Sequence, residues 1–424
     1  MSIKTPVKTL CTRPGRCRTL LIVGAPLAFA TGFKLWLALT TVGTNDVRYW
    51  HTFMDYIVAR GSVTIYRDIW YYNHPPMMSG LLKVLSWLVP YAPNGFPFLI
   101  RLPAITADTV TAIVMFRLVS FAWNERRAMA CAASVALSPI LIMVSGFHGN
   151  SDPVFMSLVL LAADRLLLGE SPVGAGLLLG LALNVKLVPL ILAPVFFFHL
   201  RQLGAKVRFS LALAAPIAAG FGYHVALAYP FMKRNVFDYG GLRGVWGLGE
   251  LCGNGWPTIT SLAAASWLKL AIALLITGRA ATLAWLDRRS RYDRSGALDG
   301  RIRGRARELL GSVGWAFLIF MLLTPGFGIQ YLTWLAIASF LLGPAGAIGY
   351  NLIGGAFMFS VYHYWNRGFP WHFADSDKVG PWRAPQALLG RAAWIYLLVW
   401  AALMMREALR RKRATRDAIA ANPV

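Results

Sequence analysis

Long runs of apolar residues, separated by short polar segments, dominate the chain. A helix that crosses a membrane needs about 20 mostly apolar residues, and the pattern predicts twelve such spans. Two of the spans are short, and we interpret them as a bent pair that meets at Lys186 and Leu187. The predicted spans cover residues 19–41, 97–121, 127–146, 152–169, 172–186, 188–200, 207–230, 257–286, 308–325, 329–345, 346–363 and 389–406. The sequence therefore predicts an all-α fold, a polytopic transmembrane helical bundle.

One further apolar stretch, at 74–89, has two interpretations. If it crossed the membrane, every segment up to the sixth span would be inverted, and Arg126, Arg127 and Arg165 would face outward. Its apolar part is about 14 residues long, which is short for a crossing. We therefore expect an amphipathic helix at the outer surface, within a first outer loop at 43–96.

Basic residues gather in segments that twelve spans place on one side of the membrane: the two termini and the loop at 287–308. Because Lys and Arg are enriched in cytoplasmic loops, we expect both termini in the cytoplasm. The expected organisation is a basic tail at 1–18, one transmembrane domain at 19–406 and a second basic tail at 407–424. The first apolar run is too long for a signal peptide, so an uncleaved anchor is favoured over cleavage near the small residues at 28–30.

The composition supports a membrane protein. Hydrophobic residues make up 57% of the chain, charged residues 14%, and the mean hydropathy is +0.53, whereas a soluble domain has about 25% charged residues. The net charge of +24 comes without a helix-turn-helix, zinc or base-stacking motif, so no nucleic-acid binding is expected. No two of Cys11, Cys17, Cys131 and Cys252 are expected on the oxidising side together, and we expect no disulfide.

The first outer loop contains the most informative polar residue, Asp46, which follows the end of the first span. Tyr49 and Trp50 lie close to it in sequence, and a carboxylate held among apolar walls is expected to resist ionisation. Such a carboxylate suits the role of general base toward a hydroxyl group. The alternative is that Asp46 caps the helix that follows it. Asp55 and Asp68 in the same loop are expected to be solvated.

A second polar cluster, formed by His148, Asn150 and Asp152, lies between two spans on the same predicted face. His148 and Asp152 are candidates for binding a metal or a sugar hydroxyl. The alternative is a helix cap, in which Asn150, Ser151 and Asp152 cap the next helix and Pro153 occupies its first turn. The two interpretations are compatible.

Lys186 interrupts an apolar segment. A lysine within the membrane costs about 2.5–3.5 kcal/mol on insertion scales, so it is a functional candidate by default. A phosphate group is a natural partner for this point charge. The alternatives are that Lys186 reaches the outer interface or pairs with an intramembrane aspartate.

Other polar residues are weaker candidates. Arg101 and Asp108 are seven residues apart on one predicted helix, which favours a structural pairing network over a site. Arg234 and Arg243 follow the seventh span, where basic residues suit a lipid-linked phosphate or are simply solvated.

The turn at 324–334 places two more polar groups, Gln330 and Tyr331, at the start of an apolar helix. Tyrosine and tryptophan also form belts at membrane interfaces without a catalytic role, and this reading is favoured for Trp365, Trp371 and Trp382.

Taken in order, these residues resemble the GT-C superfamily of integral-membrane glycosyltransferases, and bacterial polyprenol-phosphate-mannose-dependent mannosyltransferases in particular. The resemblance extends from about Asp46 to Trp334. It rests on Asp46 after the first span, the Tyr72–Pro76 stretch, Arg101-Leu102-Pro103 followed by Asp108, the His148–Asp152 cluster, the glycine-rich run that ends at Lys186, and Gln330-Tyr331 with Trp334.

The resemblance implies an active site at the outer membrane face, in which Asp46 deprotonates the acceptor hydroxyl. Family members that use lipid-monophosphate donors invert the anomeric configuration and need no metal. A relative that uses a diphosphate lipid holds a divalent metal with acidic residues, and Asn45 beside Asp46 disfavours that arrangement here. The candidate catalytic residues are Asp46 and Asp152, and the candidate substrate-binding residues are His74, Arg101, His148, Asn150, Lys186, Arg234, Arg243, Gln330 and Tyr331.

The expected reaction follows from the same resemblance. A polyprenyl-phosphate-linked sugar, most simply mannose, is the donor, and a glycan or glycolipid hydroxyl is the acceptor. Lys186, with Arg234 or Arg243, would neutralise the departing polyprenyl phosphate. The expected location is the plasma membrane, with membrane lipids as partners.

Two other functions fit parts of the sequence. A transporter or lipid flippase shares the many spans and the intramembrane charges, but such folds usually contain repeats, and none is detectable here. A phosphoethanolamine-type or acyl transferase would need a soluble catalytic domain or an activated nucleophile. Polar residues along both halves of the membrane favour transport, whereas polar residues gathered at one face favour an interfacial transferase.

Overall fold

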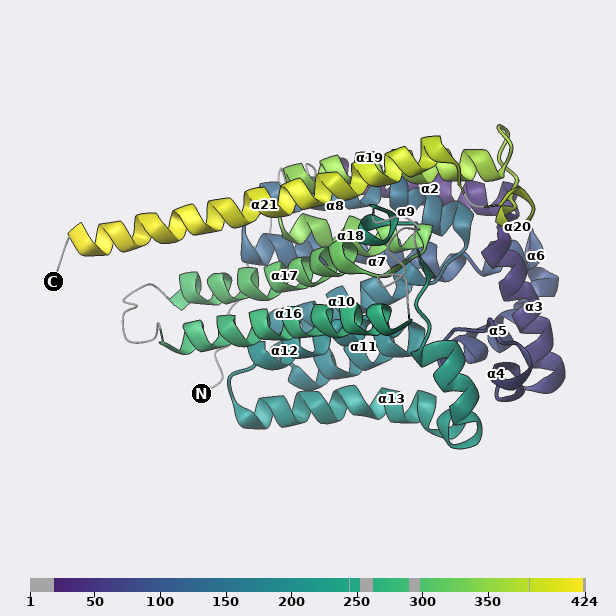
Figure 1. Cartoon of the computed structure of the whole chain (residues 1–424), viewed down its shortest axis with the longest axis horizontal. Helices are drawn as coiled ribbons and strands as arrows, with labels where there is room; N and C mark the ends of the chain where they lie inside the picture. The colour runs from purple at the N-terminus through teal and green to yellow at the C-terminus, as the bar shows by residue number, and fades with distance from the viewer. Residues whose placement is uncertain (1–18, 244, 252–261, 290–297, 381, 422–424) are drawn as a thin grey trace.

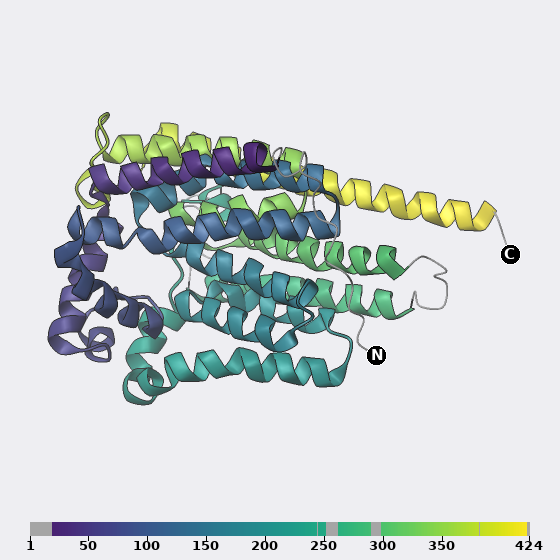
Figure 2. The ribbon, with the colours of Figure 1, turned by 180° about the vertical axis from the view of Figure 1, so that it is seen from behind.

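The structure is a computed structural model that describes residues 19–243, 245–251, 262–289, 298–380 and 382–421. The described chain is almost entirely helical, and most long helices run side by side along the long axis of the molecule (Figures 1 and 2). The all-α helical bundle predicted from the sequence is therefore confirmed.

The first half of the chain contributes the first spans and the helices of the first outer loop. Its elements are η1 (Leu20–Gly24), α2 (Ala25–Thr40), β1 (Gly43–Thr44), α3 (Asn45–Arg60), α4 (Thr64–Asp68), α5 (Pro76–Leu88), η2 (Val89–Tyr91), α6 (Gly95–Leu99), α7 (Leu102–Ala122), α8 (Glu125–Ala136), α9 (Pro139–Met143), η3 (Val144–His148), α10 (Asp152–Leu167), α11 (Pro172–Val185), η4 (Val188–Leu192) and α12 (Ala193–His199).

The second half begins with a long helix and ends with the longest one. Its elements are α13 (Leu203–Met232), η5 (Lys233–Phe237), β2 (Leu242–Arg243), α14 (Gly247–Leu251), α16 (Leu262–Arg289), α17 (Leu298–Leu323), β3 (Gly326–Phe327), η8 (Ile329–Tyr331), α18 (Leu332–Ala338), η9 (Ser339–Leu341), α19 (Pro344–Trp365), β4 (Phe373–Ala374), α20 (Ser376–Val379) and α21 (Ala384–Ala421).

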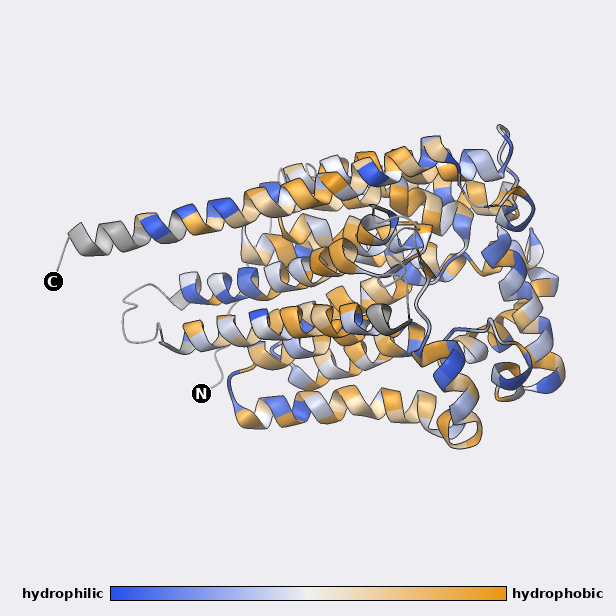
Figure 3. Ribbon diagram, in the orientation of Figure 1, coloured by the Kyte–Doolittle hydropathy of each residue, from blue (hydrophilic) through white to orange (hydrophobic). Residues whose placement is uncertain are grey.

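The two ends of the bundle differ chemically. One end, called the loop end, is formed by α3, α4, α5, α6 and α20, and its ribbon is more hydrophilic than the middle of the bundle (Figure 3). At the opposite end, called the basic end, α2 begins and α21 finishes (Figures 1 and 2). Arg301, Arg303 and Arg305 lie near the start of α17, and Arg410 lies near the end of α21, so this end is strongly basic.

Each of the twelve predicted spans coincides with a described helix or helix pair. Seven described helices are long and apolar enough to cross a membrane, judged by length and composition. Three shorter apolar helices, together with α10 and α19, account for the remaining spans. The short helix pair, α11 and η4–α12, meets at Lys186 as the sequence predicts.

The stretch at 74–89 does not cross the bundle. It forms α5, a helix of 13 residues that packs against α3 at the loop end (Figure 1). Consistent with this placement, α8, which carries Arg126 and Arg127, begins at the basic end (Figure 2). The prediction of helices in the loop at 43–96 is therefore confirmed.

Local sequence signals explain where several spans begin. The side chains of Asn124, Ser138 and Ser171 accept hydrogen bonds from backbone N–H groups in the first turns of α8, α9 and α11. Pro139 and Pro172 occupy the first turn, where a missing N–H costs nothing. These caps let the spans start sharply after short turns.

An ion pair that the sequence reasoning missed lies inside the bundle. Lys34 on α2 donates to Asp108 on α7 at 2.6 Å, and Ser145 on η3 donates to the same oxygen at 2.6 Å. The predicted pairing of Arg101 with Asp108 is therefore wrong. Arg101 instead donates to the carbonyl oxygens of Leu37 and Thr41, near the end of α2.

Two short strand pairs tie distant loops together near the loop end. β1 pairs in parallel with β4, with Gly43 opposite Phe373, and β2 pairs antiparallel with β3, with Leu242 opposite Phe327. The first pair fixes the residues that precede α3 to the loop before α20.

Some sequence predictions fall on parts of the chain that the structure does not describe. Cys131 is a buried free thiol in α8, whereas Cys11, Cys17 and Cys252 lie outside the described residues. The tail at 1–18 also lies outside them, and most of the segment at 407–424 continues α21.

Candidate active site

A cavity of about 1210 Å³ opens at the loop end. Its lining comes from α3, from the loop before α5, from the turn before α10 and from the helices that follow Lys186. Most of its polar side chains gather in one part of it, called the polar end, which contains Thr44, Asn45, Asp46, Asn73, His74, His148, Asn150, Lys186 and Gln330. Segments separated by almost three hundred positions in the sequence therefore contribute to one site.

Asp46 is held at the start of α3. Thr44 is the N-cap of this helix, and its hydroxyl accepts a hydrogen bond from the Asp46 N–H at 3.3 Å. The alternative that Asp46 itself caps the helix is therefore wrong. Asn45 is fixed by Ser376, whose N–H donates to Asn45 Oδ1 at 2.8 Å. The side chain of Asp46 is left to face the cavity.

Two buried side chains hold one oxygen of Asp46. His148 Nε2 lies 2.9 Å from Asp46 Oδ2, and Asn150 Nδ2 donates to the same oxygen at 3.1 Å. The side chain of Asp46 is 34% exposed to the cavity, whereas that of His148 is 4% exposed. Asp46 is thus the accessible member of this cluster.

The ionisation of Asp46 differs from the sequence expectation. Burial acts to raise the pKa of Asp46, but the electrostatic interaction and hydrogen bond with His148, and the hydrogen bond from Asn150, lower it to about 2. The expectation that this carboxylate resists ionisation is therefore wrong, because its neighbours outweigh the apolar surroundings.

The backbone that presents His148 requires glycine at two positions. Gly149 follows the π-helical turn η3 with φ +80°, and a Cβ there would lie 2.4 Å from Val47. Gly43 has φ +103°, and a Cβ there would lie 2.4 Å from the carbonyl oxygen of Phe147. Larger residues at either position would push α3 away from the turn that carries His148.

Lys186 forms the second charged group of the polar end. Its Nζ donates to Asp152 Oδ1 at 2.5 Å and lies over the rings of Tyr331 and Trp334, at 4.8 and 5.1 Å from their centroids. Trp334 Nε1 donates to the other oxygen of Asp152 at 2.7 Å. The Lys186 side chain is 20% exposed and that of Asp152 is fully buried, so Lys186 is the group that a ligand can reach.

Asn150 connects the two charged groups. Its Nδ2 donates to Asp46, and its Oδ1 accepts from the Asp152 N–H at 3.0 Å. Asn150 therefore binds the first backbone N–H of α10 and at the same time orients Asp46. The capping alternative holds only for Asn150, because the N-cap residue Ser151 makes no side-chain cap hydrogen bond and the carboxylate of Asp152 accepts from Lys186 and Trp334.

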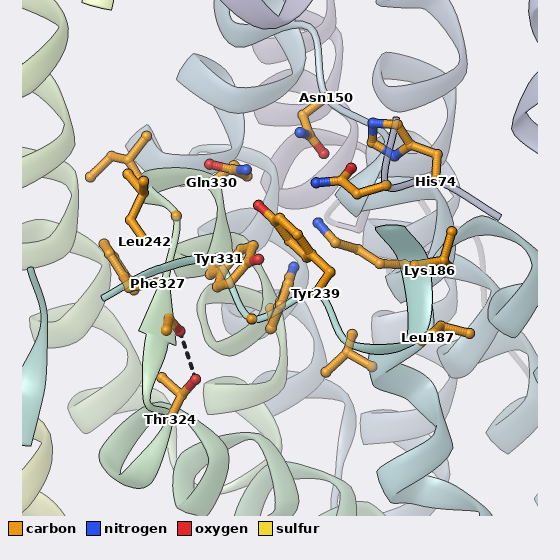
Figure 4. A pocket seen from close by; sticks show the side chains of 18 of the residues that line it. His74, Asn150, Lys186, Leu187, Tyr239, Leu242, Thr324, Phe327, Gln330 and Tyr331 are labelled. Atoms are coloured by element: carbon orange, nitrogen blue, oxygen red, sulfur yellow. Dashed lines mark hydrogen bonds between the residues drawn. The ribbon is translucent and has the colours of Figure 1, made fainter. Parts of the chain in front are cut away.

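His74 and the candidates from the turn at 324–334 also line the cavity (Figure 4). His74 stacks on Trp50 with ring centroids 4.0 Å apart. Burial lowers the pKa of His74 to about 3, and the charge of Lys186 acts in the same direction, so the ring is neutral near pH 7. Tyr331 stacks on Trp334 with ring centroids 4.0 Å apart, and Lys186 Nζ lies over both rings.

Beyond Lys186 the cavity lining becomes mostly apolar. This part, called the apolar arm, lies between η4–α12 and α16, which pack against each other. Its lining residues are Leu187, Val188, Leu190, Ile191, Ala193, Pro194, Ile272, Ala273 and Thr277. The cavity therefore joins a charged region to a region that suits a hydrocarbon chain.

Three predicted site residues do not contribute described side chains to the cavity. Arg101 is fully buried against the end of α2 and does not line the cavity. Arg234 donates to the neighbouring Asn235 and does not line the cavity either. The side chain of Arg243 lies outside the part of the chain that the structure describes.

Several residues of the site were missed from the sequence. Lys269 on α16 lines the cavity, with its Nζ donating to the carbonyl oxygen of Tyr239 at 3.1 Å. Its signal was available, because a lysine inside the predicted span 257–286 is as costly as Lys186. Tyr362 on α19 lies 2.7 Å from His148 Nδ1, and nothing in the sequence distinguished it from a buried core tyrosine.

No group of three or more His, Cys, Asp or Glu side chains with the spacing of a metal site occurs among the described residues. Asp46 and His148 are two neighbouring groups with suitable ligand atoms. The side-chain oxygen of Asn45 is already occupied by Ser376.

Comparison with known proteins gives two matches. The ALG6, ALG8 glycosyltransferase family matches residues 88–237, a segment that contains His148, Asn150 and Lys186 but not Asp46. GPI mannosyltransferase 1 of Saccharomyces cerevisiae is 25% identical over 163 residues, which are 36% of this chain and 40% of the yeast protein. Over about a third of its length the chain is therefore similar to glycosyltransferases, and its described part includes seven helices that are long and apolar enough to cross a membrane. The chain spans about 40% of the length of the yeast relative, and the family match covers the elements from η2 to η5.

Proposed function

We propose that this protein is an inverting glycosyltransferase that moves a sugar, most simply mannose, from a polyprenyl-phosphate donor to a hydroxyl acceptor. The observation that carries the proposal is the cavity itself. A reachable carboxylate, Asp46, and a reachable cation, Lys186, share one polar end, and an apolar arm leads away from it. A lipid-linked sugar phosphate has the same division into polar and apolar parts.

In the proposed reaction, the acceptor oxygen attacks the anomeric carbon while Asp46 takes the hydroxyl proton. Both hydrogen bonds to Asp46 use Oδ2, so Oδ1 is the oxygen proposed to receive the proton. The bond between the anomeric carbon and the phosphate oxygen breaks, and the lipid phosphate leaves with the electron pair. Because Asp46 is the one carboxylate among the described lining residues, a single displacement with inversion is favoured over a covalent intermediate.

The leaving phosphate is proposed to be stabilised by Lys186. The buried carboxylate of Asp152 accepts a hydrogen bond from Lys186 at Oδ1 and one from Trp334 at Oδ2, and these contacts fix the position of the lysine. We therefore assign Asp152 a positioning role instead of the catalytic role considered from the sequence. Lys269, which lines the cavity from α16, is the second cation proposed to face the phosphate.

The acceptor is proposed to be a glycan or glycolipid that enters at the loop end. Aromatic side chains that suit the faces of sugar rings line the cavity there, including Trp70, Tyr71 and Trp365. We propose that the loop end faces outward from the plasma membrane and that the basic end is cytoplasmic, following the enrichment of Arg in cytoplasmic segments. Nucleotide sugars are absent outside the cytoplasm, which favours a lipid-linked donor there.

A lipid transporter or flippase is the alternative function. The polar lining residues of the cavity gather at the loop end, and the lining of the arm is apolar. That distribution favours chemistry at one membrane face over a polar path through both halves.

The test is transfer by purified protein in nanodiscs. A panel of polyprenyl-phosphate sugars is supplied with glycolipid acceptors, with and without a chelator, and the product is analysed for anomeric configuration. We expect consumption of the mannose donor, inversion of the anomeric configuration, and no effect of the chelator.

Asp46→Asn is expected to reduce kcat by about 10²–10⁴-fold, because the proposed base is removed. Asp55→Asn, an exposed aspartate on the same helix outside the cavity, is the matched control and is expected to retain activity.

Three outcomes would contradict the proposal, each in a different way. Movement of donor lipid between leaflets without a glycosylated product would favour the flippase. Full activity of Asp46→Asn would remove this residue as the base, and loss of activity with the chelator would require a metal.

A further inference from the structure

A hydrogen-bonded chain runs from α19 to the base proposed above. The hydroxyl of Tyr362 lies 2.7 Å from His148 Nδ1, and His148 Nε2 lies 2.9 Å from Asp46 Oδ2. Tyr362 and His148 are buried, whereas Asp46 reaches the cavity. The three residues come from α19, η3 and α3, which are far apart in sequence.

The partners of the ring assign the tautomer of neutral His148. Asp46 is ionised and can only accept a hydrogen bond, so the ring proton must be on Nε2. Nδ1 then carries the lone pair and accepts from the hydroxyl of Tyr362. Among the described hydrogen bonds, Tyr362 alone satisfies Nδ1.

We propose that Tyr362 is a positioning residue, whose hydroxyl holds His148 as the Nε2–H tautomer that donates to Asp46. This inference rests on the proposed function, in which Asp46 is the base. Without the hydroxyl, the tautomer with its proton on Nδ1 becomes accessible. Nε2 would then present a lone pair to Asp46, and that contact is favourable only when the carboxylate is protonated.

The surroundings of this chain contain other groups that influence its charge. The titratable or charged groups facing it are Asp46 on α3, His74 before α5, Asp152 on α10, Lys186 after α11, Tyr239 after η5 and Tyr331 in η8. The pH profile of kcat must therefore be compared between the wild type and a Tyr362 variant. All of these groups are present in both proteins, so a difference between the two profiles reports on the Tyr362 hydroxyl.

The test is Tyr362→Phe, which keeps the ring packed near Phe147 and Trp371, at centroid distances of 5.6 and 6.1 Å. We expect the donor KM to be unchanged and the acidic limb of kcat, which lies below pH 4 in the wild type, to move up by about one pH unit, so that kcat falls at the acid end of the profile and changes little near pH 7. Activity is expected to return toward the wild-type value as the pH rises.

The matched control is Tyr350→Phe on the same helix. Tyr350 is also buried, but its hydroxyl donates to the carbonyl oxygen of Leu332 at 3.2 Å, away from His148. We expect kcat of this variant within about twofold of the wild type and an unshifted acidic limb.

A second measurement separates this inference from the proposed function. In ¹⁵N-histidine-labelled protein, the signals of His148 are identified by their loss in His148→Gln. With spectra recorded at a pH where the His148 ring is neutral, wild-type protein is expected to show the Nε2–H form, and Tyr362→Phe a mixture of tautomers. An Nδ1–H ring in the wild type, or an unchanged ring in Tyr362→Phe, overturns the inference. A tautomer change in a protein that consumes no donor would support the hydrogen-bond role and count against the proposed transferase.

Discussion

Asp46 illustrates how hydrogen-bond donors can reverse the effect of burial on a carboxylate. The sequence places it among aromatic residues, which suggests a raised pKa. The folded chain adds His148 and Asn150, which lie 102 and 104 positions away and both donate to Oδ2. The pKa of about 2 keeps the group ionised under working conditions. Its contribution to proton transfer then depends on position more than on basicity.

His148→Gln is expected to make transfer sensitive to acid. Burial of Asp46, which raises its pKa, remains in the variant, while the lowering electrostatic interaction with His148 is lost. The pKa therefore rises, and the carboxylate becomes protonated at a higher pH than in the wild type. The measurement is kcat/KM across pH 4–8, where wild-type Asp46 stays ionised throughout. A variant profile that superimposes on that of the wild type would contradict this account.

A mutational test of Lys186 must separate donor binding from protein folding, because removing the lysine alone leaves Asp152 buried without its cation. The double variant Lys186→Met/Asp152→Asn removes both charges and keeps a side chain able to accept from Trp334. A charge-assisted hydrogen bond contributes about 1.5–3 kcal/mol, so we expect the donor KM to rise about 10- to 150-fold.

The acceptor KM should change little in that double variant. Asp152→Asn alone is the matched control, since it keeps the lysine, and it is expected to weaken donor binding less. Equal donor affinity in the wild type and the double variant would rule out the phosphate role of Lys186.

At the scale of elements, the turn between α9 and α10 determines the site. It contains the π-helical turn η3, the left-handed Gly149 and the capping residue Asn150, and it presents His148 and Asn150 to Asp46. Ser145 of η3 also bonds to Asp108, which connects this turn to the ion pair between α2 and α7. The ion pair therefore supports the position of the site from within the bundle.

Lys34→Met is expected to destabilise the bundle. The variant leaves Asp108 buried without its cation, and breaking a buried pair in this way costs about 3–5 kcal/mol. The measurement is thermal unfolding of the purified protein in detergent. Lys34→Met/Asp108→Leu removes both charges and is expected to recover most of the stability. If the single variant unfolds at the wild-type temperature, the pair does not stabilise the helix packing.

At the scale of the whole molecule, the cavity depends on helices from both halves of the chain. α3 and the η3–α10 turn supply the polar end, and η4–α12 with α16 supply the apolar arm. Neither half contains the complete site. The family match covers one part of this assembly, and Asp46 and Lys269 lie outside it.

Ala273→Trp is expected to narrow the apolar arm. Ala273 is a small, exposed residue of α16 that lines the arm, so a larger side chain there projects into the space proposed for the lipid chain. We expect kcat/KM for a long polyprenyl donor to fall at least about tenfold relative to a short-chain donor. Leu274→Trp, the next residue on α16 and exposed outside the cavity, is the matched control. Equal losses for long and short donors would exclude the arm as the lipid site.

Much of the fold could be predicted because each membrane span is a continuous run of apolar residues in the sequence. Continuous apolar runs indicate the helices, and the basic segments indicate which ends lie together. Charged residues that interrupt apolar runs also identify candidates, as Lys186 does. The same reasoning, applied consistently, would have found Lys34 and Lys269.

The sequence by itself determined the helical membrane fold, the helices of the loop at 43–96 and the polar segments from which the site is built, because hydrophobic length and charge are properties of consecutive residues. The tertiary structure decided which polar groups meet. It paired Asp108 with Lys34 instead of Arg101, buried Arg101 against α2 and joined Tyr362 to His148. Contacts between distant helices depend on packing and hydrogen-bond geometry, and no local pattern specifies them.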